Sequence, residues 1–142
     1  TVLGDGILSF KLGGNSDNVY VEIRLANGDK LLTTVRNDSF NDPLCAQTML
    51  RRYVDLSAYK GQDVYVKIVD NKDGGIGFAT FDSMLMLTKS EAQMIAAQDK
   101  AYYETYFDEL MNTESTLPGD NNRAKEIVQT IRNYYANLTL LF

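Results

Sequence analysis

Short alternating segments separated by turn residues constrain the fold of this chain more than any other feature. Residues 19–25 alternate between apolar and polar side chains, as a strand with one buried face requires. The Asn27-Gly28 pair then predicts a β-hairpin, because both turn positions tolerate positive φ, and residues 30–35 form the expected return strand. We expect further strands in the segments that share this character, residues 7–12, 51–56, 63–69 and 77–87. Short strands with no helices between them predict an antiparallel β-sandwich.

Helix-forming residues dominate after Thr88. Thr88 and Glu91 fit a capping box. The segment that follows has an apolar stripe with three-four spacing, made of Ile95, Tyr102, Tyr103, Tyr106, Phe107, Leu110 and Met111. Pro118-Gly119 interrupts the pattern, and we expect Asp120 to cap a second helix. The apolar side of that helix contains Ile127, Val128, Ile131, Tyr134, Tyr135 and Leu138.

These patterns predict two parts. Residues 1–88 form a β-sandwich module, and residues 89–142 form a helical hairpin that serves as an appendage or interdomain connector. A length of 142 residues suits one small domain with such an appendage, and a hydrophobic content of 44% allows a buried core. The sequence starts at Thr1 with neither a methionine nor a signal peptide, so we expect it to be a piece of a longer chain.

Charge and composition restrict the possible functions. A net charge of -5 argues against nucleic acid as a partner, because binding to phosphates requires a basic face. No run of residues approaches the ~20 apolar residues that cross a bilayer, so we expect no membrane partner. With no histidine, the chain cannot use a Ser-His-Asp triad, a Cys-His pair or a histidine-ligated zinc ion.

Several segments together carry a resemblance to a known kind of module. They are residues 2–14, which end in Gly13-Gly14, residues 19–21, residues 55–61, and residues 68–71 with the stretch up to Asp82. In this order and spacing, residues 1–87 resemble the later part of the galactose-binding-domain-like β-sandwich modules that accompany fructan-acting glycoside hydrolases of gut and soil bacteria.

The resemblance implies a fold, a function and a location. The fold would be a mainly β, jelly-roll sandwich, followed here by the helical hairpin. The function would be that of a non-catalytic carbohydrate-binding module in a larger glycoside hydrolase, which positions polysaccharide, such as fructan, near a catalytic domain. The partners would be a polysaccharide or oligosaccharide and the adjacent domains of the parent chain. The location would be extracellular or at the bacterial cell surface.

The sequence departs from these modules in two places. They usually begin with strands that carry an Asn-Gly-Asp-Phe-Glu-like segment, which has no match here, so these strands are either missing from this piece or replaced. A loop that commonly reads Gly-Trp-Gly-His in the family holds Gly75, Ile76, Gly77 and Phe78 in this chain. The lost aromatic residue favours an alternative function, a structural or interaction spacer that no longer binds sugar.

Sugar binding requires a flat aromatic face together with polar side chains that satisfy hydroxyl groups. Tyr59 lies in the turn at residues 55–61 and is our candidate for stacking; alternatively it plugs a sheet edge. Arg51 and Arg52 are adjacent, so in a strand they point to opposite faces, and only one can face a ligand. A guanidinium can bridge two vicinal hydroxyls, although a solvated charge pair on an edge strand is the simpler interpretation.

Acidic and amide side chains supply the remaining candidates. Asp70, Asn71 and Asp73 lie on one glycine-rich loop, where their oxygens could accept from sugar hydroxyls or bind calcium, or could simply form turns. By resemblance, Asp82 on the last strand would be a ligand of a structural calcium ion. Glycoside hydrolysis would require two carboxylates at a fixed separation, and no pattern nominates such a pair. We therefore expect no catalytic residues in this segment.

Overall fold

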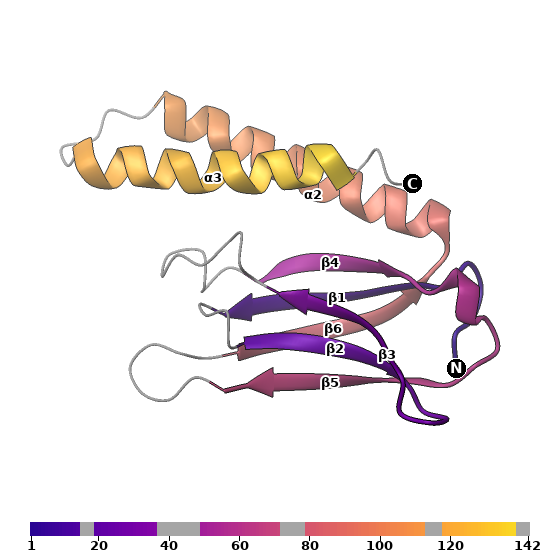
Figure 1. The fold of residues 1–142 in the computed structure, drawn as a ribbon. Coiled ribbons are helices and arrows are strands. Elements are labelled where there is room, and N and C mark those ends of the chain that lie inside the picture. Colours follow the sequence, from indigo (N-terminus) through magenta and orange to yellow (C-terminus); the bar gives the residue numbers. More distant parts are fainter. Residues whose placement is uncertain (15–18, 37–48, 72–78, 113–117, 139–142) are drawn as a thin grey trace. The chain divides into compact units, whose positions relative to one another are not determined.

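The computed structural model describes residues 1–14, 19–36, 49–71, 79–112 and 118–138. The chain divides into two compact units, Thr1–Thr88 and Lys89–Phe142. The first contains six strands and one short 3-10 helix, and the second contains two long helices (Figure 1).

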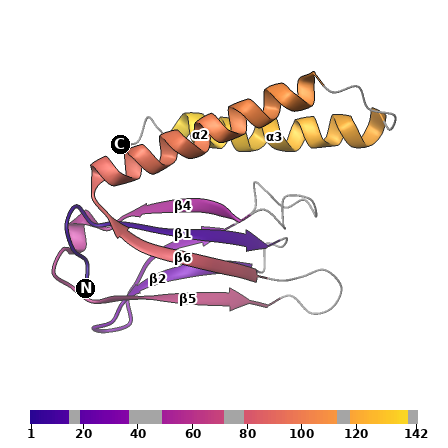
Figure 2. The same ribbon diagram turned by 180° about the vertical axis from the view of Figure 1, so that it is seen from behind.

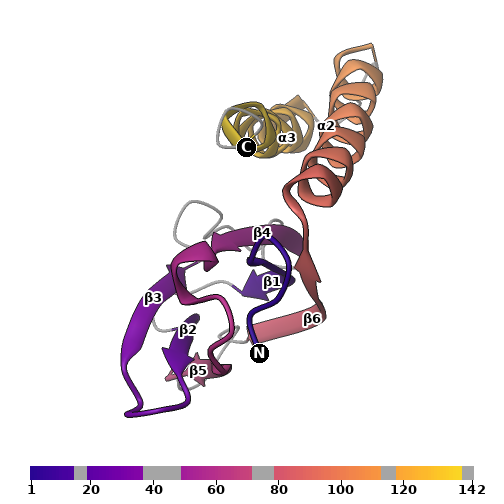
Figure 3. The same ribbon diagram turned by 90° about the vertical axis from the view of Figure 1, so that its right-hand side faces the viewer.

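Two antiparallel three-stranded sheets form the first unit. One has the order β4-β1-β6 and consists of β1 (Ile7–Gly14), β4 (Leu50–Asp55) and β6 (Ala79–Leu87). The other has the order β3-β2-β5 and consists of β2 (Val19–Leu25), β3 (Leu31–Arg36) and β5 (Val64–Asp70). Seen along the strands, the two sheets face each other (Figure 3). The predicted strands are therefore confirmed within one or two residues at their ends, and residues 77–78 lie outside the described residues.

A single hydrophobic core joins the two sheets. Its buried members come from the central strand of each sheet and from the flanking segments, and are Val2, Leu8, Phe10, Leu12, Val21, Ile23 and Leu56. Phe10 on β1 stacks on Phe81 of β6, with their ring centroids 5.1 Å apart. The alternation predicted for residues 19–25 is confirmed, since Val21 and Ile23 are buried while Glu22 between them is only half-buried.

The hairpin between β2 and β3 is present, but its turn differs from the predicted one. Positive φ angles occur at Gly28 (81°) and Asp29 (52°), and Asn27 does not adopt one. The Leu25 N–H donates to the Lys30 carbonyl oxygen at 2.8 Å, which closes a four-residue loop instead of a two-residue turn. The reason is that Asp29 tolerates the left-handed conformation and bonds to Arg24 across the loop.

Helices α2 (Lys89–Met111) and α3 (Pro118–Leu138) form the predicted helical hairpin (Figure 2). Tyr103 stacks on Tyr135 with centroids 5.4 Å apart, and the Arg132 guanidinium lies 4.5 Å from the centroid of the Phe107 ring. In the part of the chain that the structure describes, neither helix is long and apolar enough to cross a membrane.

Two expectations about the helices are wrong. The second helix starts at Pro118 instead of after Asp120, because proline suits the first helical position, where no N–H partner is needed. The buried face of α2 includes Ala92 and Ala96, which the apolar stripe omitted, whereas Tyr102 is 65% exposed. Small alanines are buried on this face of the helix, and the large tyrosine is left at the surface.

Candidate functional site

A short turn after β4 sets the position of Tyr59. The Asp55 Oδ1 accepts from the Ser57 N–H at 2.9 Å, which forms an Asx turn just before the 3-10 helix η2 (Ser57–Tyr59). Gly6 allows this turn to pack closely, because a Cβ at Gly6 would lie 2.9 Å from the Ser57 nitrogen. The Leu56 N–H also donates to the Gly6 carbonyl oxygen at 2.7 Å.

Tyr59 lines a pocket of about 340 Å³ between β3 and β4, which we call the seam pocket. Its lining is Leu32, Thr33, Val35, Tyr53, Val54, Asp55, Leu56 and Tyr59. The aliphatic members supply apolar walls, and Thr33, Asp55 and Tyr59 supply a hydroxyl, a carboxylate and a phenol. An apolar cleft with a few polar groups is the usual form of a small-molecule site. Tyr59 is half-buried and packs on the core, as expected for a residue that fills a sheet edge. It also lines the pocket, where its ring could contact a ligand.

Arg51 is placed elsewhere, in a buried network. Its Nη1 donates to the Ser9 Oγ and to the Ser83 carbonyl oxygen, each at 3.0 Å, and Arg51 as a whole is only 7% exposed. Ser83 has a φ of 55° at the point where the β1–β6 register shifts. Arg51 therefore binds a β-bulge, and the interpretation as a solvated charge on an edge strand is wrong for this residue, because the guanidinium is enclosed with its acceptors.

Arg52 points to the other face of β4, as adjacent strand positions require. The register pairs Arg52 with Phe10 and Arg51 with Lys11. Since Phe10 is a core residue, Arg52 lies on the core-facing side and is half-buried. Neither arginine lines the seam pocket.

The polar residues at the far end of β5 are not brought together with Tyr59. Asp70 pairs with Val19, whereas Val64 at the other end of β5 pairs with Leu25. The Gln62 N–H, just before β5, donates to the Tyr59 carbonyl oxygen at 3.0 Å, so Tyr59 lies at the Val64 end of β5. Asn71 follows Asp70 and is exposed, as Asp70 is. Asp73 and the 75–78 loop lie outside the described residues, so their predicted sugar contacts stay predictions.

Asp82 is exposed on β6, and its environment offers little to a cation. Its Oδ1 accepts from the Ser83 N–H at 2.7 Å, and its cross-strand partner is Lys11. Calcium prefers six to eight oxygen ligands. Among the described residues, no three His, Cys, Asp or Glu side chains gather in a group that could hold a metal ion. The described residues therefore supply no acidic cluster beside Asp82, and a calcium ligand at Asp82 stays a prediction.

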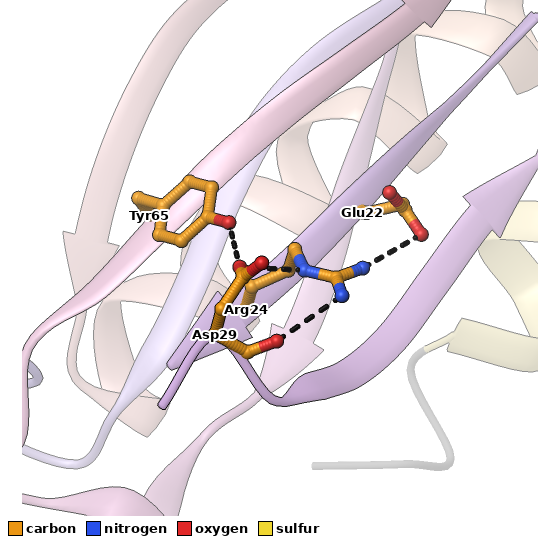
Figure 4. A network of polar contacts seen from close by, with 4 residues as sticks. All are labelled: Glu22, Arg24, Asp29 and Tyr65. Atoms are coloured by element: carbon orange, nitrogen blue, oxygen red, sulfur yellow. Dashed lines mark hydrogen bonds and ion pairs between the residues drawn. The ribbon is translucent and has the colours of Figure 1, made fainter. Parts of the chain in front are cut away.

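A polar network that the sequence analysis did not identify lies on the solvent side of the β3-β2-β5 sheet (Figure 4). The Arg24 Nε donates to the Asp29 Oδ1 at 2.9 Å, and its Nη2 donates to the Asp29 carbonyl oxygen at 3.1 Å. The Arg24 Nη1 contacts the Glu22 Oε2 at 3.1 Å, and the Tyr65 hydroxyl donates to the Asp29 Oδ1. This network ties the β2–β3 loop to β5.

Its electrostatics follow from these contacts. The hydrogen bond from Tyr65 and then that from Arg24 lower the pKa of Asp29, because both stabilise the carboxylate. The same bond to Asp29 raises the pKa of the Tyr65 phenol. Only the cross-strand pairing of Arg24 with Tyr65 could have revealed the network, and that requires the β2–β5 register. The Asp29 and Glu22 carboxylates already accept from Arg24 and so are engaged within the network. We therefore interpret the network as a structural one that stabilises the β2–β3 loop.

Comparison of the chain with protein-family models, with curated proteins and with solved structures finds no match. No family is thereby assigned to the seam pocket or to the polar network, and their function follows from their chemistry alone.

Proposed function

We propose that this chain is a non-catalytic carbohydrate-binding module of a larger extracellular bacterial glycoside hydrolase, and that it positions polysaccharide, such as fructan, near a catalytic domain. The observation that carries the proposal is the seam pocket, in which Tyr59 lies with Asp55 and Thr33. A tyrosine ring can cover the apolar face of a sugar, while a carboxylate and a hydroxyl satisfy its hydroxyl groups.

The pocket has the size and polarity that such a ligand needs. A volume of about 340 Å³ falls in the range of small-ligand sites, near its lower end, which suits one sugar unit of a chain. The pocket is lined by β3, β4 and the turn that the Asp55–Ser57 bond stabilises, so its polar groups are fixed by the fold. Weak binding of single units is sufficient, because tethering raises the effective concentration of an enzyme at its polymer.

The finer fold assignment is part of this proposal. Two antiparallel three-stranded sheets around one core support a galactose-binding-like sandwich in Thr1–Thr88. The resemblance adds a structural calcium ion, to which the described surroundings of Asp82 lend no support.

A spacer function is the second candidate, and one observation favours it. Tyr59 lies at one end of the sheets and Asp70 at the other, so the residues predicted to bind sugar form no single site. A spacer module of this kind would hold neighbouring domains apart or provide a surface for their docking, and it would need no ligand.

Affinity electrophoresis in gels that contain levan, inulin, xylan or galactan tests the proposal, with calcium and with chelator. We expect one polymer to retard the chain, and Tyr59→Ala and Asp55→Asn to reduce the retardation. Asp55→Asn keeps an oxygen that can accept from the Ser57 N–H, so it changes the charge with little effect on the turn. Tyr102→Ala is the matched control, because Tyr102 is an exposed tyrosine on α2. Unchanged mobility of the folded chain in every polymer would leave the spacer function.

A further inference from the structure

The strand β5 is a regular and open edge of its sheet in the part of the chain that the structure describes. It pairs with β2 through every position from Val64 to Asp70 with no register shift. On the other sheet, β6 lies at the same side of the unit, but its ladder with β1 shifts between Ser9 and Lys11. A bulge blunts an edge, whereas a long regular edge presents a row of backbone groups to another strand.

An apolar groove of about 240 Å³ lies between these two edges, and we call it the β5–β6 groove. Its lining is Thr1, Leu8, Val64, Tyr65, Val66, Met84, Leu85 and Met86. Beyond the groove, Ile68 pairs with the core residue Val21 and so lies on the core-facing side, yet it is 47% exposed. Val64 and Val66 on the same side are partly buried against the core, so the exposed apolar surface of this edge consists of Ile68 and the adjoining groove. An exposed apolar surface beside a groove can mark an interaction site.

The solvent-facing side of β5 carries a charge that selects among occupants. Lys67 is exposed and pairs across the sheet with Glu22, but the Glu22 carboxylate is bound by Arg24 at 3.1 Å. Among the described residues, the Lys67 side chain makes no ion pair, and its charge acts only at longer range on the Asp29 carboxylate, which Arg24 and Tyr65 already bind. Its ammonium group is therefore available to a carboxylate on an adjoining strand, where opposite charges in a cross-strand pair are stabilising.

We propose that the β5 edge binds, by strand addition, an extended peptide segment of a partner protein whose alternate side chains are apolar and which places a carboxylate beside Lys67. The backbone edge requires an extended partner, and the period of two in a strand directs every second side chain into the β5–β6 groove. The other side chains of the segment then lie on the solvent side with Lys67. This inference does not depend on sugar binding, because it concerns the opposite seam of the two sheets.

A second copy of this chain fits the edge less well. Two antiparallel β5 strands in the central register place Lys67 opposite Lys67, and like charges directly opposite each other are destabilising. The lysine in the middle of the strand thus acts against self-association while favouring an acidic partner.

Fluorescence anisotropy with labelled, capped peptides tests the proposal on the intact chain. The probe is Val-Thr-Val-Glu-Val-Thr-Val, compared with the peptide that has a central lysine and with one N-methylated at alternate amides. We expect saturable binding of the glutamate peptide and binding about two- to five-fold weaker for the lysine peptide. We expect no binding of the N-methylated peptide, because its methyl groups replace the amide hydrogens that would pair with β5. Lys67→Glu should reverse the preference between the two charged peptides.

Two lysine substitutions locate the site. Ile68→Lys should weaken binding of the glutamate peptide by about tenfold or more, because it puts a charge on the apolar side of the edge. Leu31→Lys is the control, since Leu31 is exposed on β3 at the opposite edge of the same sheet and should bind as the parent chain does. Absence of saturable binding to the folded chain up to about 1 mM peptide would overturn the proposal. So would equal loss in both variants, or a dimer, seen by light scattering, that Ile68→Lys dissociates.

Discussion

The Arg51 guanidinium donates a hydrogen bond to the Ser83 carbonyl oxygen at 3.0 Å, and through it β4 holds the bulge of β6 across the intervening strand β1. The same Nη1 donates to the Ser9 Oγ on β1, whose hydroxyl in turn donates to the Arg52 carbonyl oxygen at 2.9 Å. One side chain thus connects all three strands of the sheet, and the left-handed Ser83 is fixed by a buried donor.

Replacing Arg51 should therefore destabilise the sheet. Arg51→Met keeps much of the volume but removes the donor from the buried Ser9 Oγ and from the Ser83 carbonyl oxygen, and the loss of hydrogen bonds from a charged donor costs about 1.5–3 kcal/mol. The free energy of unfolding from urea titration measures the loss. Lys60→Met is the control, because Lys60 is exposed and its replacement should change stability by less than about 0.5 kcal/mol. Equal stability of the two variants would show that the Arg51 network contributes nothing.

A methyl group at Gly6 should disturb the turn that positions Tyr59. Gly6→Ala faces two costs, a φ of 76° and a Cβ that would lie 2.9 Å from the Ser57 nitrogen. Gly28→Ala is matched in φ, at 81°, but has open space around the Cβ, so it should lose only the conformational term of about 1–2 kcal/mol. We expect Gly6→Ala to lose more in urea unfolding and also to weaken any polysaccharide retardation. Equal losses would mean that the close approach of Ser57 relaxes freely.

Strand positions could be predicted from the sequence because alternation is a local property. In β2, Val21 and Ile23 face the core for a reason visible in seven residues of sequence. The position of the hairpin loop could not be predicted in the same way. It depends on the bond between Arg24 and Asp29, which competes with the ordinary preference of an Asn-Gly pair.

The candidate site was predictable only in its central residue. Tyr59 follows a recognisable turn sequence, and that turn is present. Thr33 comes from a different strand, and its place beside Tyr59 depends on how the two sheets pack. The burial of Arg51 could not be predicted from local sequence either. Its burial depends on a bulge at Ser83, more than thirty residues later, and no local pattern predicts a bulge there.

Stability should depend on pH at both ends of the range through Asp29 and Tyr65. The pKa of Asp29 is lowered in the folded chain, so its contribution is present above the unfolded value near 3.8 and is lost as the pH falls through the folded pKa. The pKa of Tyr65 is raised, so its contribution is present below 10.0 and is lost as the pH rises through the folded pKa.

Tyr65→Phe tests both windows at once, because it removes the donor to Asp29 and the phenol itself. We expect the variant to lose less stability than the parent chain on acidification below pH 4 and on alkalinisation above pH 10, as measured by urea unfolding across the pH range. Tyr102→Phe is the control, since Tyr102 lies on α2 and should leave both limbs of the curve unchanged. Parallel curves for Tyr65→Phe and the parent chain would contradict the assigned bond.

The helical hairpin should depend on one tyrosine pair. Tyr135 is 1% exposed and stacks on Tyr103 with centroids 5.4 Å apart. Tyr135→Ala should cost the second unit about 3–5 kcal/mol, because it removes a large buried ring and leaves a cavity. Tyr102→Ala deletes the same group where it is 65% exposed, and its cost should stay within about 0.5 kcal/mol. Thermal loss of helical circular dichroism measures both, and an equally small effect of the two variants would mean that α2 and α3 are held together without this stack.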